Sequence, residues 1–213
     1  MERKRSFSQL KQQKKFKEFC SFCKKVTEDY ANSEARFSES YFTEHYNISR
    51  RCFCEVIKYA IETNLVEDEI VFKAMEKSVR NSESHSKGSG DRSRANYEKM
   101  YARKCQYIAM LVPKKEIEKA VIDFAYNPDI SKKDIATAYG WNRKTFEILL
   151  VKAIEENIAD DRTVEAIETR SINNADVEKR EYTKDYFTGL KKKREAKKAK
   201  KILADYEKFR ENN

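Results

Sequence analysis

The chain has 213 residues, of which 38% are charged and 39% are hydrophobic, and it contains only 4 glycines and 2 prolines. So few turn-forming residues exclude a many-stranded sheet, and the sequence predicts an all-α fold. The net charge of +9 results from 45 basic and 36 acidic residues. No apolar stretch approaches the roughly 18 residues needed to cross a bilayer, and the basic N-terminus is not followed by an apolar signal segment. We therefore expect a cytoplasmic protein with no membrane partner.

Apolar residues recur at three- and four-residue steps from Phe16 to Tyr30 and again within 41–65 and 71–79. This period places them on one face of each helix and predicts an N-terminal helical module over residues 1–81. The following polar segment contains two of the four glycines and has almost no apolar residue to bury. Such a composition predicts a flexible linker over residues 82–96.

Helical periodicity resumes at Tyr97, stops before Pro113 and restarts at Ile117, which predicts a second helical module over residues 97–178. Charge dominates the remainder, so we predict a basic helical tail over residues 179–213 with almost no core of its own. Within the tail, residues 191–201 contain eight cations and a single acid, and the cations are Lys191, Lys192, Lys193, Arg194, Lys197, Lys198, Lys200 and Lys201.

An internal repeat relates the two modules at an offset of 93 residues. With a one-residue gap it extends back to Asp29 and Asp123. Duplication of one module explains a match in a single register, although a chance match of short helical segments is the alternative. The identical pairs are Ser38 and Ser131, Tyr46 and Tyr139, Arg50 and Arg143, Phe53 and Phe146, Ala60 and Ala153, Ile61 and Ile154, Glu62 and Glu155, Asn64 and Asn157, and Asp68 and Asp161.

The second copy contains two adjacent helix starts. Ser131 is a good N-cap, and Asp134 stands three residues later, from where its carboxylate can reach the backbone of the cap. Gly140 follows soon afterwards and can adopt the left-handed conformation that a helix end requires. Asn142 then begins a helix over 143–157. Two helices with so short a turn predict a helix-turn-helix over residues 131–157, and an ordinary helical hairpin is the alternative.

At these residues the sequence resembles the helix-turn-helix of bacterial and phage repressors and sigma factors. In that pattern an alanine stands four residues before the turn glycine, as Ala136 does before Gly140. Apolar residues are expected where this chain has Ile135, Tyr139, Trp141, Phe146 and Leu149. The first copy, over residues 38–61, is degenerate, because Thr43 replaces the alanine and Asn47 replaces the glycine.

The resemblance implies that the second helix of each motif inserts its first turns into the major groove of DNA. Arg can bond guanine, Asn can bond adenine and Glu can accept from cytosine, so the residue types permit base reading. The alternative is that they are solvated residues on a helix face. The candidates are Asn142, Arg143, Lys144 and Glu147 in the second copy, and Ser49, Arg50, Arg51 and Cys54 in the first.

The basic tail is predicted to clamp the phosphate backbone, because eight cations beside one acid repel one another unless a polyanion is present. The alternatives are a solubilising helix or, less favoured, a membrane-surface helix, for which the apolar face is too small. The residues assigned to the clamp are Lys191, Lys192, Lys193, Arg194, Lys197 and Lys198.

A four-cysteine zinc site was the other candidate, formed by Cys20, Cys23, Cys52 and Cys54. The first two share the apolar stripe of their helix and the last two point to different sides, so we expect core thiols, no metal and no cofactor. Acidic pairs such as Asp160 and Asp161 are expected to start a helix instead of binding a metal. No histidine has a nucleophile nearby in the sequence, which predicts a protein that is not an enzyme.

Together these features predict a protein that binds duplex DNA and regulates transcription in a bacterium, phage or mobile element. The sequence leaves open whether the protein forms a homodimer or binds a partner protein. An RNA-binding or ribonucleoprotein component is one alternative, and it would stack bases on exposed aromatic rings, whereas most of the 12 tyrosines lie at core spacings. A helical adaptor for other proteins is the second alternative, and it would not need the lysine-rich tail.

Overall fold

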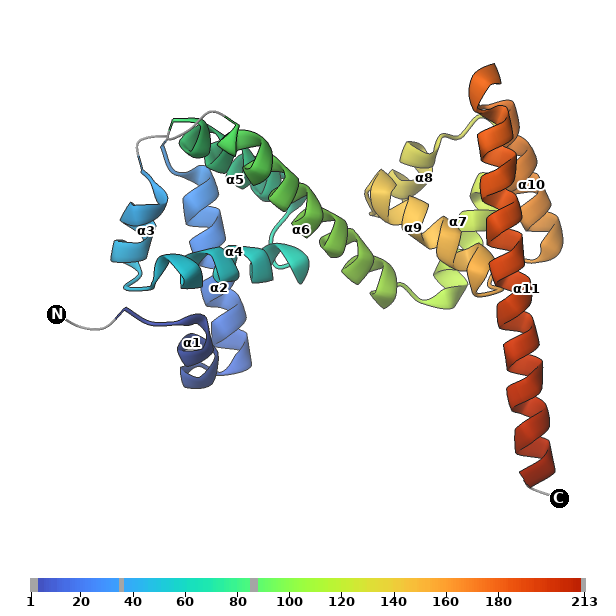
Figure 1. The fold of residues 1–213 in the computed structure, drawn as a ribbon, viewed down its shortest axis with the longest axis horizontal. Coiled ribbons are helices and arrows are strands. Elements are labelled where there is room, and N and C mark those ends of the chain that lie inside the picture. The colour runs from blue at the N-terminus through green and yellow to red at the C-terminus, as the bar shows by residue number, and fades with distance from the viewer. Residues whose placement is uncertain (1–3, 35–36, 85–87, 212–213) are drawn as a thin grey trace. The chain divides into compact units, whose positions relative to one another are not determined.

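The computed structural model describes residues 4–34, 37–84 and 88–211 (Figure 1). These residues form an all-α fold, as predicted, with one isolated bridge between Arg5 and Ile48 and no strand in the described part. The chain divides into two compact units, residues 1–107 and residues 108–213. None of the described helices is both long and apolar enough to cross a membrane.

The first unit is built around α2, which packs against both α4 and α5. Aromatic rings fill its core, and Tyr30 packs edge-on against Phe53 with ring centroids 5.2 Å apart. The helices are α1 (Phe7–Gln13), α2 (Phe16–Asn32), α3 (Glu39–His45), α4 (Arg50–Glu62), α5 (Asp68–Glu83) and α6 (Ser89–Leu111), of which the last residues from Ile108 belong to the second unit.

The second unit also contains a 7-residue helix followed by a 13-residue helix, as the first unit does in α3 and α4. Its helices are α7 (Lys114–Tyr126), α8 (Lys132–Ala138), α9 (Arg143–Glu155), α10 (Asp161–Asn173), a single 3₁₀ turn (Val177–Lys179) and α11 (Arg180–Glu211). The helix α10 packs on α7, and α11 packs on both α9 and α10. Phe124 and Phe146 meet edge-on in the core, with ring centroids 5.6 Å apart.

The predicted flexible linker over residues 82–96 is wrong in its described part, because α5 extends to Glu83 and α6 begins at Ser89. Tyr97, which was expected to open the second module, is buried in the core of the first unit. One turn earlier, the hydroxyls of Ser78 and Ser93 lie 2.7 Å apart and join α5 to α6. A hydrogen bond between serine hydroxyls lets this polar segment pack as a helix against α5 without a continuous apolar face. Residues 85–87 lie outside the described residues.

The prediction of a tail without a core is also wrong. Phe187 and Leu190 on α11 are each 3% exposed and belong to the core of the second unit. Two apolar residues three positions apart are enough to bury one face of a helix, although the surrounding lysines hide them in the composition. The helix α11 is therefore an integral part of the second unit over its first half.

The helices α6 and α11 are fastened to their units by matching ion pairs. Arg103 contacts Glu62 at 2.8 Å in the first unit, and Lys193 contacts Glu155 at 3.1 Å in the second. The two glutamates are 93 residues apart, whereas the two cations are 90 residues apart. The sequence repeat therefore continues into α6 and α11, but at an offset of 90 residues instead of 93. A search at the single offset of 93 residues does not detect this continuation.

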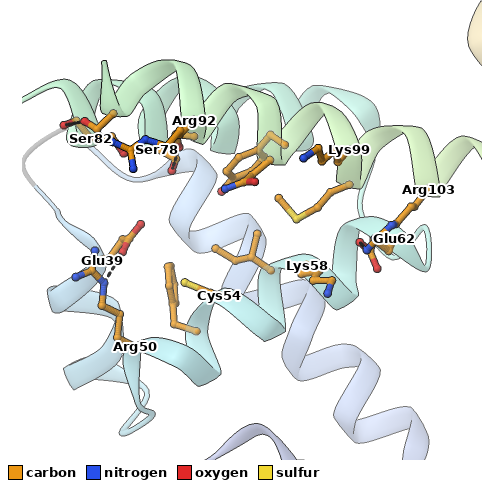
Figure 2. A pocket seen from close by; sticks show the side chains of 17 residues that line it. Glu39, Arg50, Cys54, Lys58, Glu62, Ser78, Ser82, Arg92, Lys99 and Arg103 are labelled. Carbon is orange, nitrogen blue, oxygen red and sulfur yellow. Dashed lines mark hydrogen bonds and ion pairs between the residues drawn. The ribbon is translucent and has the colours of Figure 1, made fainter. Parts of the chain in front are cut away.

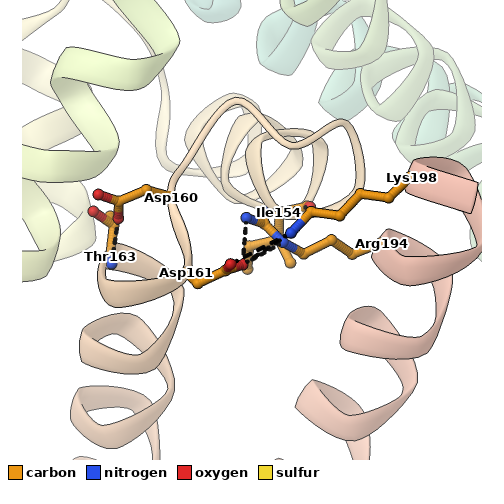
Figure 3. Close-up of polar contacts among 6 residues, drawn as sticks. All are labelled: Ile154, Asp160, Asp161, Thr163, Arg194 and Lys198. Atoms are coloured by element: carbon orange, nitrogen blue, oxygen red, sulfur yellow. Dashed lines mark hydrogen bonds and ion pairs between the residues drawn. The ribbon is translucent and has the colours of Figure 1, made fainter. Parts of the chain in front are cut away.

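The next residue along each helix makes a second matching contact. Lys104 reaches Asp68 at 2.6 Å, and Arg194 reaches Asp161 at 2.8 Å (Figure 3). Both cations are buried, and each also donates a hydrogen bond to a backbone carbonyl, that of Val66 for Lys104 and that of Ile154 for Arg194. A buried charge is tolerated only when it is paired and hydrogen-bonded, and both conditions are met here.

In each repeat, a cation on the fourth helix binds carbonyl oxygens at or just after the end of the first helix; Lys77 is buried and Arg170 is half-buried. Lys77 donates to the carbonyl oxygens of Ser33 and Glu34, at 3.2 and 3.0 Å, just after α2 ends. Arg170, 93 residues later, donates to the carbonyl oxygen of Phe124 near the end of α7. Its guanidinium carbon also lies 4.0 Å from the ring centroid of Phe124. In both units the cation satisfies carbonyls that a helix end leaves without partners.

The turn residue Gly140 has φ +71°, in the left-handed region, as predicted. No atom lies within 4 Å of the position that a Cβ would take there, so the cost of a side chain is backbone strain and not a clash. We expect Gly140→Val to lower the free energy of unfolding by at least about 1–2 kcal/mol. Gly140→Asn should cost less, since Asn47 adopts φ 49° at the matching turn. Denaturant unfolding of both variants checks this, and an equal loss for both would contradict it.

The pairing of Asp161 makes stability depend on pH. Hydrogen bonds from Arg194 and Lys198 lower the pKa of this carboxyl in the folded state. Its stabilising contribution is therefore present above the unfolded pKa of about 3.9 and is lost as pH falls through the lower folded pKa. We expect Asp161→Asn to lower the melting temperature at pH 7, and the difference from the unmodified chain to shrink below about pH 4. Asp205→Asn, an exposed change on α11, is the control and should have no comparable effect.

Candidate nucleic-acid interface

The helix α8 begins where the sequence predicts. The hydroxyl of Ser131 accepts a hydrogen bond from the backbone of Asp134 at 3.2 Å, and the Asp134 carboxylate accepts one from the backbone of Ser131 at 3.0 Å. The turn that follows is closed by a hydrogen bond of 2.7 Å from the Trp141 amide to the Ala136 carbonyl. Ala136 is buried, in agreement with the need for a small side chain where α8 meets α9.

Asn142 is the N-cap of α9, again as predicted. Its side-chain oxygen accepts a hydrogen bond of 2.8 Å from the backbone of Thr145. A cap of this kind stabilises a helix by about 1 kcal/mol. Reading of adenine by Asn142 would have to compete with this bond, so its principal role in the free protein is to start α9.

Arg143 and Glu147 lie on one face of α9, where the guanidinium Nε is 3.0 Å from the carboxylate. Their side chains are 67% and 41% exposed. An exposed pair one helical turn apart contributes only about 0.3–0.5 kcal/mol. The Arg143 side chain is therefore held in position but is easily released to another acceptor. Lys144, the next residue, is exposed.

Two lysines that the sequence analysis did not single out line the same face. Lys132 and Lys133, on the first turn of α8, border a groove of about 650 Å³ together with Arg143 and Glu147. We call this the second groove; its opposite wall is the start of α11. The signal in the sequence was a pair of lysines directly after the capping serine. In the helix-turn-helix pattern the first helix crosses the phosphate backbone, which is where such lysines would act.

The first unit contains the corresponding arrangement with different chemistry. The hydroxyl of Ser49 caps α4 by accepting from the backbone of Cys52 at 3.1 Å. Arg50 contacts Glu39 at 3.2 Å, and Arg51 is exposed. Cys54 stands at the position of Glu147 and is exposed. The first turn of α4 therefore presents cations but no acceptor for cytosine.

A groove of about 660 Å³ also borders α4, between this helix and α6 (Figure 2). We call it the first groove. Figure 2 shows cations on both of its walls, with Lys58 on α4 and Arg92 and Lys99 on α6. Its two acids, Glu39 and Glu62, are already paired with Arg50 and Arg103. Matching positions of the two units line the two grooves, since Arg50, Ile57, Ser78 and Tyr97 correspond to Arg143, Leu150, Ser171 and Phe187.

The predicted phosphate clamp on α11 requires correction. Arg194 is only 5% exposed and is bound to Asp161, so it cannot reach a phosphate. The expectation that the cations repel one another without a polyanion fails because acids of α9 and α10 neutralise them. Within the described residues, Lys192 alone of the six assigned cations has no ion pair. Lys191 contacts Glu168, and Lys193 and Lys197 contact Glu155. Lys198 contacts Asp161 (Figure 3).

The cysteines are divided between core and surface. Cys23 and Cys52 are buried in the first unit, and burial raises the pKa of Cys23 to about 12 and that of Cys52 to about 11. Both thiols are therefore protonated at neutral pH, whereas Cys54 points out of the core. The described part of the chain contains no cluster of three His, Cys, Asp or Glu side chains that could hold a metal ion. Asp160 caps α10 and Asp161 is its first residue, as predicted.

Comparisons of the chain with protein-family models, with curated proteins and with solved structures found no match.

Proposed function

We propose that this protein binds duplex DNA and that the second unit reads the sequence through α9. The observation that carries the proposal is the position of four exposed or half-buried cations at the starts of two adjoining helices: Lys132 and Lys133 on α8, and Arg143 and Lys144 on α9. The short helix, the glycine turn and the capped second helix match the motif that the sequence resembles. That motif places the start of its second helix in the major groove.

The energies of the competing contacts favour transfer of Arg143 to a base. Its pair with Glu147 contributes about 0.3–0.5 kcal/mol, whereas a bidentate contact with guanine contributes about 1–3 kcal/mol of discrimination. Glu147, once released, can accept a hydrogen bond from cytosine. Arg143 and Glu147 would then read bases, while Lys132, Lys133 and Lys144 would bind phosphates.

The first unit has a supporting role in this proposal. The contacts shared by paired positions, such as Tyr46 with Asp29 and Tyr139 with Asp123, support an origin of both units from one helix-turn-helix module. Thr43 replaces the small alanine without disrupting α3, because its hydroxyl donates to the Ser40 carbonyl at 2.8 Å. Without an acid at Cys54, α4 binds the phosphate backbone through its arginines. Regulation of transcription is the role that we propose for such a protein.

Replacement of Arg143 tests the assignment of the reading helix. After selection of a preferred site from random duplexes, Arg143→Ala should weaken binding to that site by ~1–3 kcal/mol and affect random DNA much less. Arg50→Ala, the matched change in the first unit, should reduce discrimination less. Fluorescence anisotropy titrations measure both variants. If Arg143→Ala weakens all sequences equally while Arg50→Ala removes discrimination, the first unit is the reader; if neither matters, the proposal is wrong.

A second test concerns the lysines of α11 that have no ion pair within the described residues, Lys192, Lys200 and Lys201. Their joint replacement by Gln should reduce the slope of log K against log[salt] by up to about 2.7, since each phosphate contact contributes about 0.9. The control replaces Lys24, Lys73 and Arg80 by Gln, which removes the same charge from cations already paired on α2 and α5. An unchanged slope for the α11 variant excludes these lysines as phosphate contacts.

A further inference from the structure

Two tyrosines on α11 are exposed and lie outside the buried core of the second unit. Tyr182 is 76% exposed and Tyr186 is 45% exposed. They are four residues apart, so both lie on the same face of the helix. Tyr186 packs edge-on against Phe187, its neighbour in the chain, at 5.7 Å between ring centroids.

Both rings line the second groove, which lies within the second unit. The opposite wall is formed by Lys132 and Lys133 of α8 and by Arg143 of α9. Aromatic rings on one wall and cations on the other are the two components with which proteins bind single-stranded nucleic acids. The rings stack on the bases, and the cations follow the phosphates.

We infer that the second groove binds unpaired nucleobases of a single strand, by stacking on Tyr182 and Tyr186 while Lys132, Lys133 and Arg143 hold the adjoining phosphates. The spacing of the two rings fits this ligand. Side chains one helical turn apart have Cβ atoms about 5–6 Å apart. A base that lies between two rings needs a ring separation of roughly 6.8 Å, which is twice the ~3.4 Å step of a strand. The two distances are similar. The inference deepens the proposed function, and it rests on that proposal for the role of Lys132, Lys133 and Arg143 in binding phosphates.

The first groove provides a natural comparison. With the three-residue shift that relates α6 to α11, Tyr182 corresponds to Arg92 and Tyr186 corresponds to Asn96. Both of these residues line the first groove, where no exposed ring takes their place. The first groove can therefore attract phosphates but has no platform on which a base could stack at these two positions. The two grooves differ in ligand chemistry although they occupy matching places in their units.

The test uses single-stranded 12-mers of deoxyadenosine and of adenosine, each carrying a fluorescent label, and measures anisotropy at fixed salt with the full chain. Tyr182→Ala/Tyr186→Ala should weaken binding of the single strand about tenfold or more, because each stacked base contributes that much. Tyr182→Phe/Tyr186→Phe should bind normally, since stacking does not need the hydroxyl. Preference for the deoxyadenosine or the adenosine strand identifies the natural ligand as DNA or RNA, and either result supports the inference when it depends on the rings.

Matched controls separate this inference from duplex reading. Arg92→Ala/Asn96→Ala in the first groove should change single-strand binding less than threefold, and the double alanine variant of the tyrosines should keep its affinity for the selected duplex. Circular dichroism shows whether each variant folds. If the double variant unfolds, Tyr182→Ala alone replaces it in the titrations, because Tyr182 is the more exposed of the two residues. No binding of either strand, or equal binding by the alanine variants and the unmodified chain, overturns the inference. Arg143→Ala should weaken single-strand binding as well as sequence discrimination, because Arg143 holds a phosphate in the second groove; unchanged single-strand binding in that variant contradicts this role. Absence of duplex binding in the unmodified chain refutes only duplex reading.

Discussion

The contact on which the rest depends is the one between a buried cation and the acid at the start of the preceding helix, which joins α6 to α5 in the first unit and α11 to α10 in the second. Arg194 with Asp161, and Lys104 with Asp68, each take a charge out of water and bind it to a carboxylate and to a backbone carbonyl. A hydrogen bond to a charged group contributes about 1.5–3 kcal/mol, and an unpaired buried charge would cost more. The pairing therefore fixes where α6 and α11 lie, and these helices in turn form one wall of each groove.

The same pairing redistributes the positive charge that the composition reveals. Five of the eight cations within residues 191–201 are bound to acids of α9 and α10 and hold the unit together. The charge available to a polyanion lies at Lys132, Lys133, Arg143 and Lys144 on the starts of α8 and α9, and on α11 at the lysines that have no ion pair within the described residues. The lysine-rich α11 and the cations at the starts of α8 and α9 are thus two different features of this protein, and the binding surface that we propose lies at the second.

The two units share contacts between matching positions and differ at exposed positions of their grooves. The residues that hold helices together are kept, as with Lys77 and Arg170, which bind the end of the first helix of each repeat. Some of the residues that line the grooves differ, since Tyr182 and Tyr186 in the second groove take the place of Arg92 and Asn96 in the first. Loss of a contact within the fold would destabilise a unit, whereas an exposed groove residue can change at little cost to stability. In our proposal, this difference gives the second groove a ligand of its own.

The sequence by itself determined the local features: the all-α class, the caps at Ser131 and Asn142, and the left-handed turn at Gly140. These depend on residues within one or two turns of each other, so spacing and residue type are sufficient. Only the tertiary structure decided that the polar segment after residue 88 and the lysine-rich segment after residue 179 are integral helices. Few core residues hold these two helices in place, and their cations pair with acids that are distant in the sequence. Arg194 and Asp161, for example, are separated by 33 residues. Composition cannot show which distant charges meet, because that depends on how the helices pack.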